Sequence, residues 1–489
     1  MVATNRLHLA FVALLWTGCT STAAPSPESS MTREELVDPE RCKSCHPDQY
    51  REWASSMHAY ATDDPVFTAM CERGQRETGL KLGTFCLKCH APQAVADELI
   101  VSAAEDIYKL PKAYRGVTCF FCHTVDAVTG SHNNGLHQAN DLVLRGPLSD
   151  PLRTDAHRSS YSTLHDRDQI GSSDLCGSCH DVVAPSGAAL ERGYAEWHGS
   201  VFNQTPGGTT CGQCHMPQSP QSKTVAAVEG APIRRAHSHM FPAVDTALTE
   251  WPDKAAMASA VQTELNKTLQ SALCVKKIGA GAQLSVILDN VAGGHGFPSG
   301  AALDRRLWVE LVAKKAGKMI YQTGNVPDGV VVDDGKDPDL WLLRECAYDA
   351  NGKLVHMFWQ VASVVGNTLP VQLTFNQSDP RFYQSHVRGD FPANGTQLAE
   401  MPDEVTLRVR LQPIGRDVLD DLLESGDLTA ALRDAMPNWQ VGQTLVWTPE
   451  TATHAFQQDG LAVSCRTETN LNPQADSVPA KRLVGCKAQ

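Results

Sequence analysis

The spacing of hydrophobic and polar residues changes character near residue 275. Residues 253–273 are mostly good helix formers (Ala, Met, Gln, Glu, Leu, Lys), and they predict one long helix. β-Branched or alternating runs bounded by Gly, Pro, Asn and Asp follow, and they predict strands at Gln283–Asn290, Leu307–Lys314, Val355–Val365 and Val405–Gln412. The strands indicate a β-sandwich over residues 277–450, with a helix at 415–435 and a loop-like tail.

The part of the chain before residue 250 has no such runs. With 36 Gly and 28 Pro in the whole sequence, we expect many turns there, and short helices joined by long connections. The predicted fold class is therefore α+β, with a mostly short-helix half followed by a β-sandwich-like half.

The N-terminus has the pattern of an export signal. Arg6 and His8 precede an apolar run from Leu9 to Trp16, which is too short to span a bilayer. Two cleavage sites fit. The sequence before Cys19 resembles a lipoprotein box, with Cys19 becoming the lipidated N-terminus, whereas ordinary cleavage would fall after Ala24. The Ser/Pro/Thr-rich stretch that follows suits a flexible tether behind a lipid.

The overall composition says less about function than the clustering of cysteines and histidines does. The 489 residues are 42% hydrophobic and 20% charged, which is ordinary for a soluble globular protein. The formal net charge of −13 argues against a nucleic-acid partner. The unusual feature is the content of 16 cysteines and 18 histidines, many of them grouped in one pattern.

Ten cysteines form five copies of Cys-x-x-Cys-His, which we number motifs 1 to 5. The cysteine pairs are Cys42 and Cys45, Cys86 and Cys89, Cys119 and Cys122, Cys176 and Cys179, and Cys211 and Cys214; the following histidines are His46, His90, His123, His180 and His215. Two thiols at this spacing can add to both vinyl groups of one haem, and the adjacent His then lies under the iron as the proximal ligand. Zinc ribbons and disulfide scaffolds also use paired cysteines, but neither requires a His after every pair. The motifs therefore predict five covalent haem c groups.

The sequence around the motifs repeats. The segment Tyr50–Trp53 matches Tyr194–Trp197, and residues 83–92, with motif 2, match residues 208–217, with motif 5. We therefore predict two modules, 40–92 and 174–217, each with two motifs, and motif 3 between them. One position differs, because Phe202 stands where the first copy has His58.

These features suggest domain boundaries. The predicted segments are a signal peptide at 1–24, a tether at 25–39, a pentahaem cytochrome domain at 40–250, a connecting helix at 251–276, a β-sandwich domain at 277–450 and a C-terminal tail at 451–489. Outside the motifs and Cys19, five cysteines remain. We favour a disulfide between Cys465 and Cys486, which would staple the tail, and we expect Cys71 to be a free thiol; Cys274 and Cys346 are left open.

The chain resembles the multihaem cytochromes related to the nitrifier tetrahaem cytochrome and hydroxylamine oxidoreductase. The resemblance rests on motif 1 followed by Tyr50, Trp53, Ser56 and His58, on the surroundings of motifs 3 to 5, and on a Gly-His-x-x-Pro-Ser-Gly segment that opens the β-domain, as in bacterial cytochromes with a C-terminal sandwich. It covers roughly residues 40–300.

The resemblance implies stacked haem pairs with mainly bis-His ligation. It implies that the distal ligands, on the faces opposite the motif histidines, include His58, His157, His239 and His295, the last reaching back from the β-domain. For the fifth distal ligand, His137, His132 and His165 compete.

Two functions fit these features. The first is an electron carrier between redox partner proteins of the periplasm or outer membrane, at low potential because His/His ligation lacks the Met that raises it. The alternative is a reductase or oxidase of a small nitrogen or sulfur compound at one open haem. No Cys-x-x-Cys-Lys site is present and no residue stands out as catalytic, so electron transfer is favoured over enzyme activity. The protein is expected to be exported and held at a membrane through Cys19 if that residue is lipidated, in the periplasm, at the outer membrane or at the cell surface.

Overall fold

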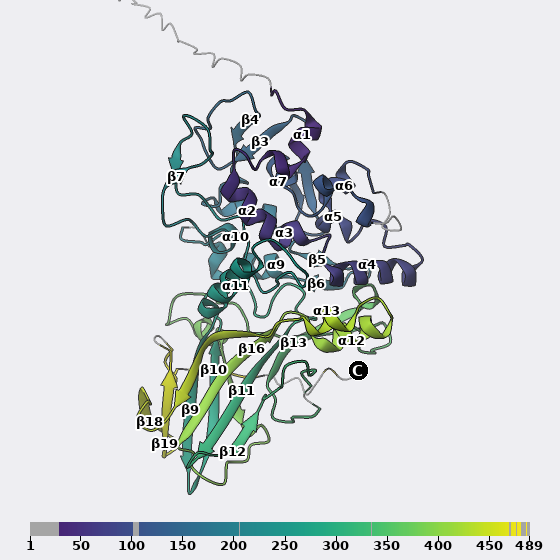
Figure 1. The fold of residues 1–489 in the computed structure, drawn as a ribbon. Helices are drawn as coiled ribbons and strands as arrows, with labels where there is room; N and C mark the ends of the chain where they lie inside the picture. Colours follow the sequence, from purple (N-terminus) through teal and green to yellow (C-terminus); the bar gives the residue numbers. More distant parts are fainter. Residues whose placement is uncertain are drawn as a thin grey trace, which may run out of the picture.

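The computed structural model combines a helical part and a sheet part, and the fold is α+β (Figure 1). It describes residues 29–100, 107–204, 206–333, 335–468, 471–475, 477–480 and 486. The predicted signal peptide and Cys19 lie outside the described residues. In Figure 1 the first half of the chain, in purple to teal, forms the upper part, and long green to yellow strands form the lower part.

Most helices lie in the first half of the chain. They are α1 (Arg33–Val37), α2 (Pro47–Ser55), α3 (Met57–Tyr60), α4 (Pro65–Thr78), α5 (Leu87–His90), α6 (Pro92–Ala96), α7 (Cys119–Thr124), α8 (Ser173–Gly177), α9 (Gly193–His198), α10 (Cys211–His215), α11 (Lys254–Thr268), α12 (Arg416–Glu424) and α13 (Ala430–Asp434). Short 3-10 turns are η1 (Pro39–Arg41), η2 (Ile107–Lys109), η3 (Lys112–Tyr114), η4 (Ile170–Ser172), η5 (Val201–Asn203), η6 (Phe358–Gln360) and η7 (Pro380–Ser385).

Among the described residues, the strands fall into four small two-stranded sheets and two large ones. The small sheets pair β1 (Val125–Gly130) with β2 (Gly135–Gln138), β3 (Val143–Gly146) with β4 (Arg158–Tyr161), β5 (Val182–Val183) with β6 (Ala189–Glu191), and β7 (Lys223–Thr224) with β8 (Ile233–Arg234). The later strands are β9 (Gln270–Ile278), β10 (Gly281–Asp289), β11 (Arg306–Lys315), β12 (Lys318–Thr323), β13 (Leu342–Tyr348), β14 (Ser363–Asn367), β15 (His386–Phe391), β16 (Glu404–Gln412), β17 (Trp439–Trp447), β18 (His454–Gln458), β19 (Leu461–Thr467) and β20 (Val478–Pro479).

The two large sheets share one hydrophobic core. Their strand orders are β18-β19-β9-β10-β15-β20 and β14-β13-β11-β16-β17, with β12 added beside β11. β16 illustrates how the strands form this core. Buried and partly exposed residues alternate along it, and its buried side chains, such as Leu407, pack with those of β10 and β11. Each fully buried Leu or Val in this core contributes about 1.5–3 kcal/mol through removal from water.

Several elements differ from their predicted bounds. The long helix ends at Thr268, and β9 begins at Gln270, because residues 270–278 bury one face in the sheet core. The helix expected at 415–435 is two helices, α12 and α13, separated at Gly426, which has a left-handed φ of 81°. The tail expected to be loop-like contains β18 and β19, which extend the first large sheet.

The expected Cys465–Cys486 disulfide is wrong. Cys274 bonds Cys465, and Cys346 bonds Cys486. The cause is strand register, because Cys274 on β9 lies directly opposite Cys465 on β19. Cys71 is a buried free thiol.

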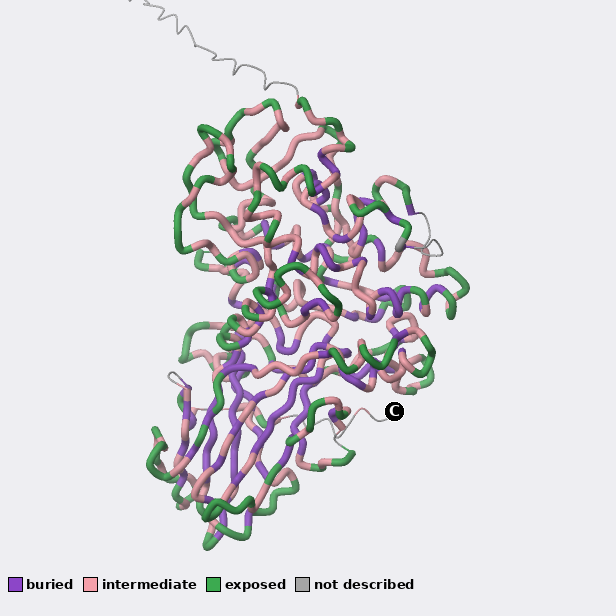
Figure 2. Tube along the Cα trace, viewed as in Figure 1, coloured by how far each residue is buried: buried purple, intermediate pink, exposed green. Residues whose placement is uncertain are grey.

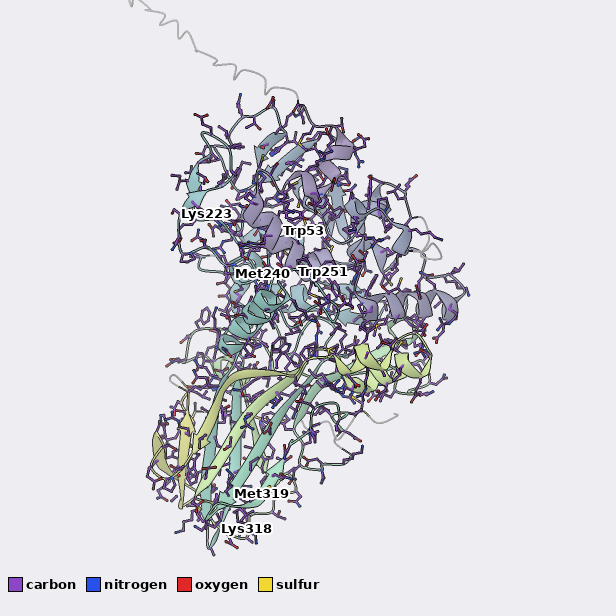
Figure 3. All side chains as sticks on the ribbon, viewed as in Figure 1. Trp53, Lys223, Met240, Trp251, Lys318 and Met319 are labelled. Atoms are coloured by element: carbon purple, nitrogen blue, oxygen red, sulfur yellow. A yellow bond between two sulfur atoms is a disulfide. The ribbon has the colours of Figure 1, made fainter. Side chains whose placement is uncertain are left out.

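The two parts of the molecule meet through apolar and charged contacts. Val66 and Met70 of α4 pack against Leu419 and Leu422 of α12, where Figure 1 shows these helices side by side. Met240, labelled at the junction in Figure 3, packs against the core between the sheets. Within the described residues, no helix is long and apolar enough to cross a membrane.

Candidate haem-binding site

All five motifs lie in the upper part, on or beside short helices. Motifs 3 and 5 open α7 and α10, and in each the preceding threonine, Thr118 or Thr210, caps the helix by accepting a backbone N–H bond. Motif 1 ends at His46, directly before α2, whose first residue is Pro47. Each turn therefore fixes its two cysteines and its histidine as one unit.

Hydrogen bonds fix the tautomer of most histidines at this site. In six rings Nδ1 lies 2.5–3.2 Å from a backbone carbonyl oxygen; these are His46, His90, His123, His215, His239 and His295. A carbonyl oxygen only accepts, so Nδ1 must donate and the lone pair lies on Nε2. This arrangement is the one that metal-binding histidines use.

Four of the five motif histidines have a second His ring facing them at one common spacing. The ring centroids are 6.3 Å apart for His46 and His157, 6.1 Å for His180 and His58, 6.5 Å for His123 and His239, and 6.4 Å for His215 and His295. Two metal–nitrogen bonds of about 2.0 Å, with about 1.1 Å from each nitrogen to its ring centre, place coaxial imidazoles about 6.2 Å apart. The four pairs therefore fit axial ligation of one iron each.

Burial keeps three of the facing rings neutral. Loss of solvent lowers the pKa of His58 to about 3 and those of His239 and His295 to about 4. It also lowers the pKa values of the motif histidines His46, His123 and His180. A neutral ring carries the lone pair that a metal requires, so the geometry and the protonation state agree.

His90 of motif 2 is different. Within the described part of the chain, no other His ring lies at the 6.1–6.5 Å that the four pairs share. Phe67 of α4 instead stacks on the His90 ring, with centroids 3.8 Å apart and planes 6° apart, and the carbonyl oxygen of Ala61 accepts from Nδ1 at 3.1 Å. The ring is therefore held firmly on one side without a partner ligand on the other.

The three candidates for a fifth distal ligand do not reach His90. The β1–β2 hairpin projects His137 into solvent, where its ring bonds Asp126 and stays 61% exposed, so the expectation for His137 is not supported. His132 is exposed in the same hairpin turn. His165 lies near motif 3, and its Nε2 donates to the carbonyl oxygen of Cys122 at 2.8 Å.

The internal repeat is present in the structure, but it links motifs other than those predicted. Trp53 Nε1 donates to the carbonyl oxygen of Val117, and Trp197 Nε1 donates to that of Thr209, each at 2.8 Å. Val117 stands two residues before motif 3, and Thr209 stands two residues before motif 5. Motif 5 is thus equivalent to motif 3, and the predicted match with motif 2 is wrong.

Further contacts of the two helices agree with this pairing. The Tyr50 hydroxyl donates to Glu40, two residues before motif 1, and the Tyr194 hydroxyl donates to Asp174, two residues before motif 4. Cys119 of motif 3 lowers the pKa of the Cys42 thiol of motif 1, and Cys176 of motif 4 likewise lowers the pKa of the Cys211 thiol of motif 5. α2 and α9 therefore each hold two motifs together, 1 with 3 and 4 with 5.

The substituted position of the repeat keeps its backbone role. The Val117 amide donates to the carbonyl oxygen of His58, and the Thr209 amide donates to that of Phe202, both at 2.8 Å. Only the side chains differ: His58 crosses to face His180, whereas Phe202 packs edge-on against Phe375. The repeated Tyr and Trp residues of the sequence could have predicted these contacts, but the apparent match between motifs 2 and 5 led to the wrong pairing.

Burial differs between the two parts (Figure 2). Buried residues follow the long strands of the lower part, whereas most residues of the upper part are intermediate or exposed. Cofactors that supply much of the apolar core around the motifs would produce this pattern.

Comparison with known proteins agrees with these features. Residues 41–124, which contain motifs 1 to 3, match the family model described as cytochrome c554 and c-prime. The fold is similar to the crystal structure of a penta-heme cytochrome c552 from Thermochromatium tepidum, with a TM-score of 0.56 and 20% identity, covering 85% of this chain and 99% of that one. Together these findings support a multihaem c-type cytochrome with haem c as its cofactor. Among curated proteins, none matches the chain.

Proposed function

We propose that this protein binds five haem c groups, one at each motif, and relays electrons between redox partner proteins. Four groups take two axial histidines each, His46 with His157, His123 with His239, His180 with His58, and His215 with His295. The common spacing of these four pairs is the observation that carries the proposal. Each bound haem supplies the uptake and release of one electron.

The protein's own residues hold these sites close and rigid. Neighbouring thiols shift pKa values between motifs 1 and 3, between motifs 2 and 4, and between motifs 4 and 5, and Cys122 of motif 3 raises the pKa values of both cysteines of motif 4. These couplings connect all five motifs and support a chain of neighbouring groups. Nδ1–H bonds to carbonyl oxygens fix the rings, and a fixed, bis-His environment favours low potentials and little reorganisation.

His90 supports a second candidate function. With Phe67 stacked on its ring and no facing His among the described residues, the motif-2 haem would keep an open axial position. A small nitrogen or sulfur compound could bind there, as in a reductase or oxidase. The same relay of four bis-His groups would then supply or remove its electrons.

The partners and location remain as the sequence suggests. We propose export through the N-terminal segment, attachment to the outer membrane by lipid on Cys19, and redox proteins rather than nucleic acid as partners. The net charge of −13, with the propionates that haem groups would add, favours partners with basic surfaces.

Potentiometry combined with turnover assays tests the two candidates. An electron relay predicts uptake of five electrons per chain, with reduction and reoxidation by protein redox partners and no turnover of nitrite, hydroxylamine or tetrathionate. Steady turnover of one of these compounds would favour the second candidate. Uptake of fewer than five electrons would contradict the proposed cofactor count.

A further inference from the structure

We propose that Glu52 and Glu196, equivalent residues of the two repeats, are positioning residues that clamp the distal histidine segments of motifs 3 and 5. The inference rests on the axial pairs proposed above and goes beyond them. Those pairs assign ligands, whereas this inference assigns the groups that deliver two of the ligands from remote parts of the chain.

Glu52 holds the segment of His239. Its Oε2 accepts the backbone N–H of His239 itself at 2.8 Å, across 187 residues of sequence. The His239 ring faces His123 of motif 3, and Trp53, the neighbour of Glu52 on α2, bonds the carbonyl of Val117 just before that motif. One helix turn therefore holds the backbone on both sides of the same axial pair.

Glu196 does the same in the second repeat. Its Oε2 accepts the backbone N–H of Gly296 at 3.0 Å and the Ser299 hydroxyl at 3.2 Å, across 100 and 103 residues of sequence. Gly296 follows His295, whose ring faces His215 of motif 5, and Trp197 bonds the carbonyl before that motif.

The loop of His295 is shaped for this contact. A Cβ on Gly296 would lie 3.0 Å from Glu196 Oε1, so a larger residue there would push the carboxylate away from the backbone. Asn290 supports the loop from the other side, because its Nδ2 donates to the carbonyl oxygen of His295 at 2.7 Å. Carboxylate bonds to backbone N–H groups are charge-assisted, which suits segments that arrive from far away in sequence.

The repetition distinguishes a clamp from an incidental contact. In both copies the residue before the tryptophan is glutamate, and in both copies it bonds the backbone at or next to a histidine that faces the motif held by that tryptophan. The two distal segments are unrelated: His239 lies in the linking region of the upper part, and His295 lies in the loop between β10 and β11. The same glutamate contact thus holds two unrelated distal histidine segments.

Competition between carbon monoxide and the distal histidine measures how strongly the clamp holds that histidine on its haem. In the reduced holoprotein, an external ligand must displace the distal His, so its apparent affinity rises as His binding weakens. Loss of the carboxylate bonds in Glu196→Ala should raise the CO affinity of one bis-His haem roughly 10- to 100-fold, and Glu52→Ala should do so at another. His295→Ala and His239→Ala provide the reference spectra of those two haems.

Conservative variants separate positioning from general destabilisation. Glu196→Gln and Glu52→Gln keep an acceptor oxygen without the charge, and their CO affinity should stay much closer to that of the parent than in the alanine variants. Glu196→Asp and Glu52→Asp keep the charge but shorten the reach and should resemble the alanine variants. Glu77→Ala is the matched control, because Glu77 also bonds across the two parts, to Trp359 and Gln360, without touching a histidine segment.

Each outcome decides between the proposals. Parent-like CO affinity and ferric spin state in the Ala and Asp variants would overturn the clamp, as would an equal change in Glu77→Ala. If the Ala variants fail to fold, the Asp variants give the same decision. If His295→Ala and His239→Ala themselves leave CO binding unchanged, the axial pairs are wrong and the clamp falls with them; if they change it and the glutamate variants do not, only the clamp fails.

Discussion

The ring that faces His123 provides the sharpest mutational test of the axial pairs. Two neutral rings lie near it, His165 at 5.6 Å and His239 at 6.5 Å. The closer ring is not the expected ligand, because His165 Nε2 donates to the Cys122 carbonyl oxygen and is already used. His239 Nδ1 donates to a carbonyl oxygen, which leaves Nε2 free to bind iron.

The two alanine variants should therefore behave differently. His239→Ala opens a second axial position, so CO uptake by the reduced protein should rise from one to two per chain and the low-spin ferric haems should fall from four to three. His165→Ala loses two hydrogen bonds, to Cys122 and Ser162, at 2.8 and 3.0 Å. At about 0.5–1.5 kcal/mol each, stability should drop by about 1–3 kcal/mol while CO uptake stays at one.

The assay combines CO titration of the dithionite-reduced protein, low-temperature paramagnetic resonance of the ferric form and chemical denaturation. All three use the holoprotein, and covalent haem content provides the check that cofactor loading is equal. Binding of two CO per chain in His165→Ala, with only one in His239→Ala, would refute the assignment of His239 from its tautomer.

Three further predictions concern stability. Replacing both Cys274 and Cys465 by serine should lower the unfolding free energy by about 2–5 kcal/mol, because the bond closes a loop of 191 residues in sequence separation, and an unchanged denaturation midpoint would contradict this. Asp417→Asn should cost about 3–5 kcal/mol at pH 7, since Arg306, with a fully buried side chain, bonds Asp417 at 2.6 Å; a loss below about 1 kcal/mol would show the pair to be dispensable. Burial raises the pKa of Asp304 to about 7, so the folded state binds a proton that the unfolded state releases near pH 4, and stability should fall as pH rises between these values. The unfolding free energy of Asp304→Asn should lack this pH dependence, so relative to the parent it should rise by up to about 4 kcal/mol between about pH 4 and pH 7. Denaturation at several pH values measures this difference, and the same dependence of unfolding free energy on pH in both proteins would exclude this role of Asp304.

The elements that could be predicted from sequence are those with a strong local signal. β10, β11 and β16 coincide closely with their predicted runs. β16 alternates between buried and partly exposed residues, whereas β10 and β11 are nearly continuous buried runs, and both patterns are typical of strands that contact a core. β18 is not predicted because it is short and lies at a sheet edge, where exposed polar residues such as Gln457 give no hydrophobic pattern. The end of the long helix was missed because residues 269–273 suit both helix and strand, and burial in the sheet decides between them.

Long-range pairing could not be predicted in the same way. The Cys465–Cys486 disulfide is predicted because it would staple the tail, whereas β-sheet register brings Cys465 opposite Cys274. The repeat is correctly predicted in α2 and α9, but the flanking residues of motif 2 resemble those of motif 5 and lead to the wrong match. Hydrogen bonds of Trp53 and Trp197, which depend on the folded chain, reveal the correct equivalence.

The spin-state count of the native ferric protein tests the central claim most directly. Quantified paramagnetic resonance at low temperature, referenced to total covalent haem, should give four low-spin bis-His haems and one high-spin haem per chain, the last at motif 2 where His90 has Phe67 beside it and no facing His in the described structure. Five low-spin haems, or two or more high-spin haems in the intact protein, would contradict the account.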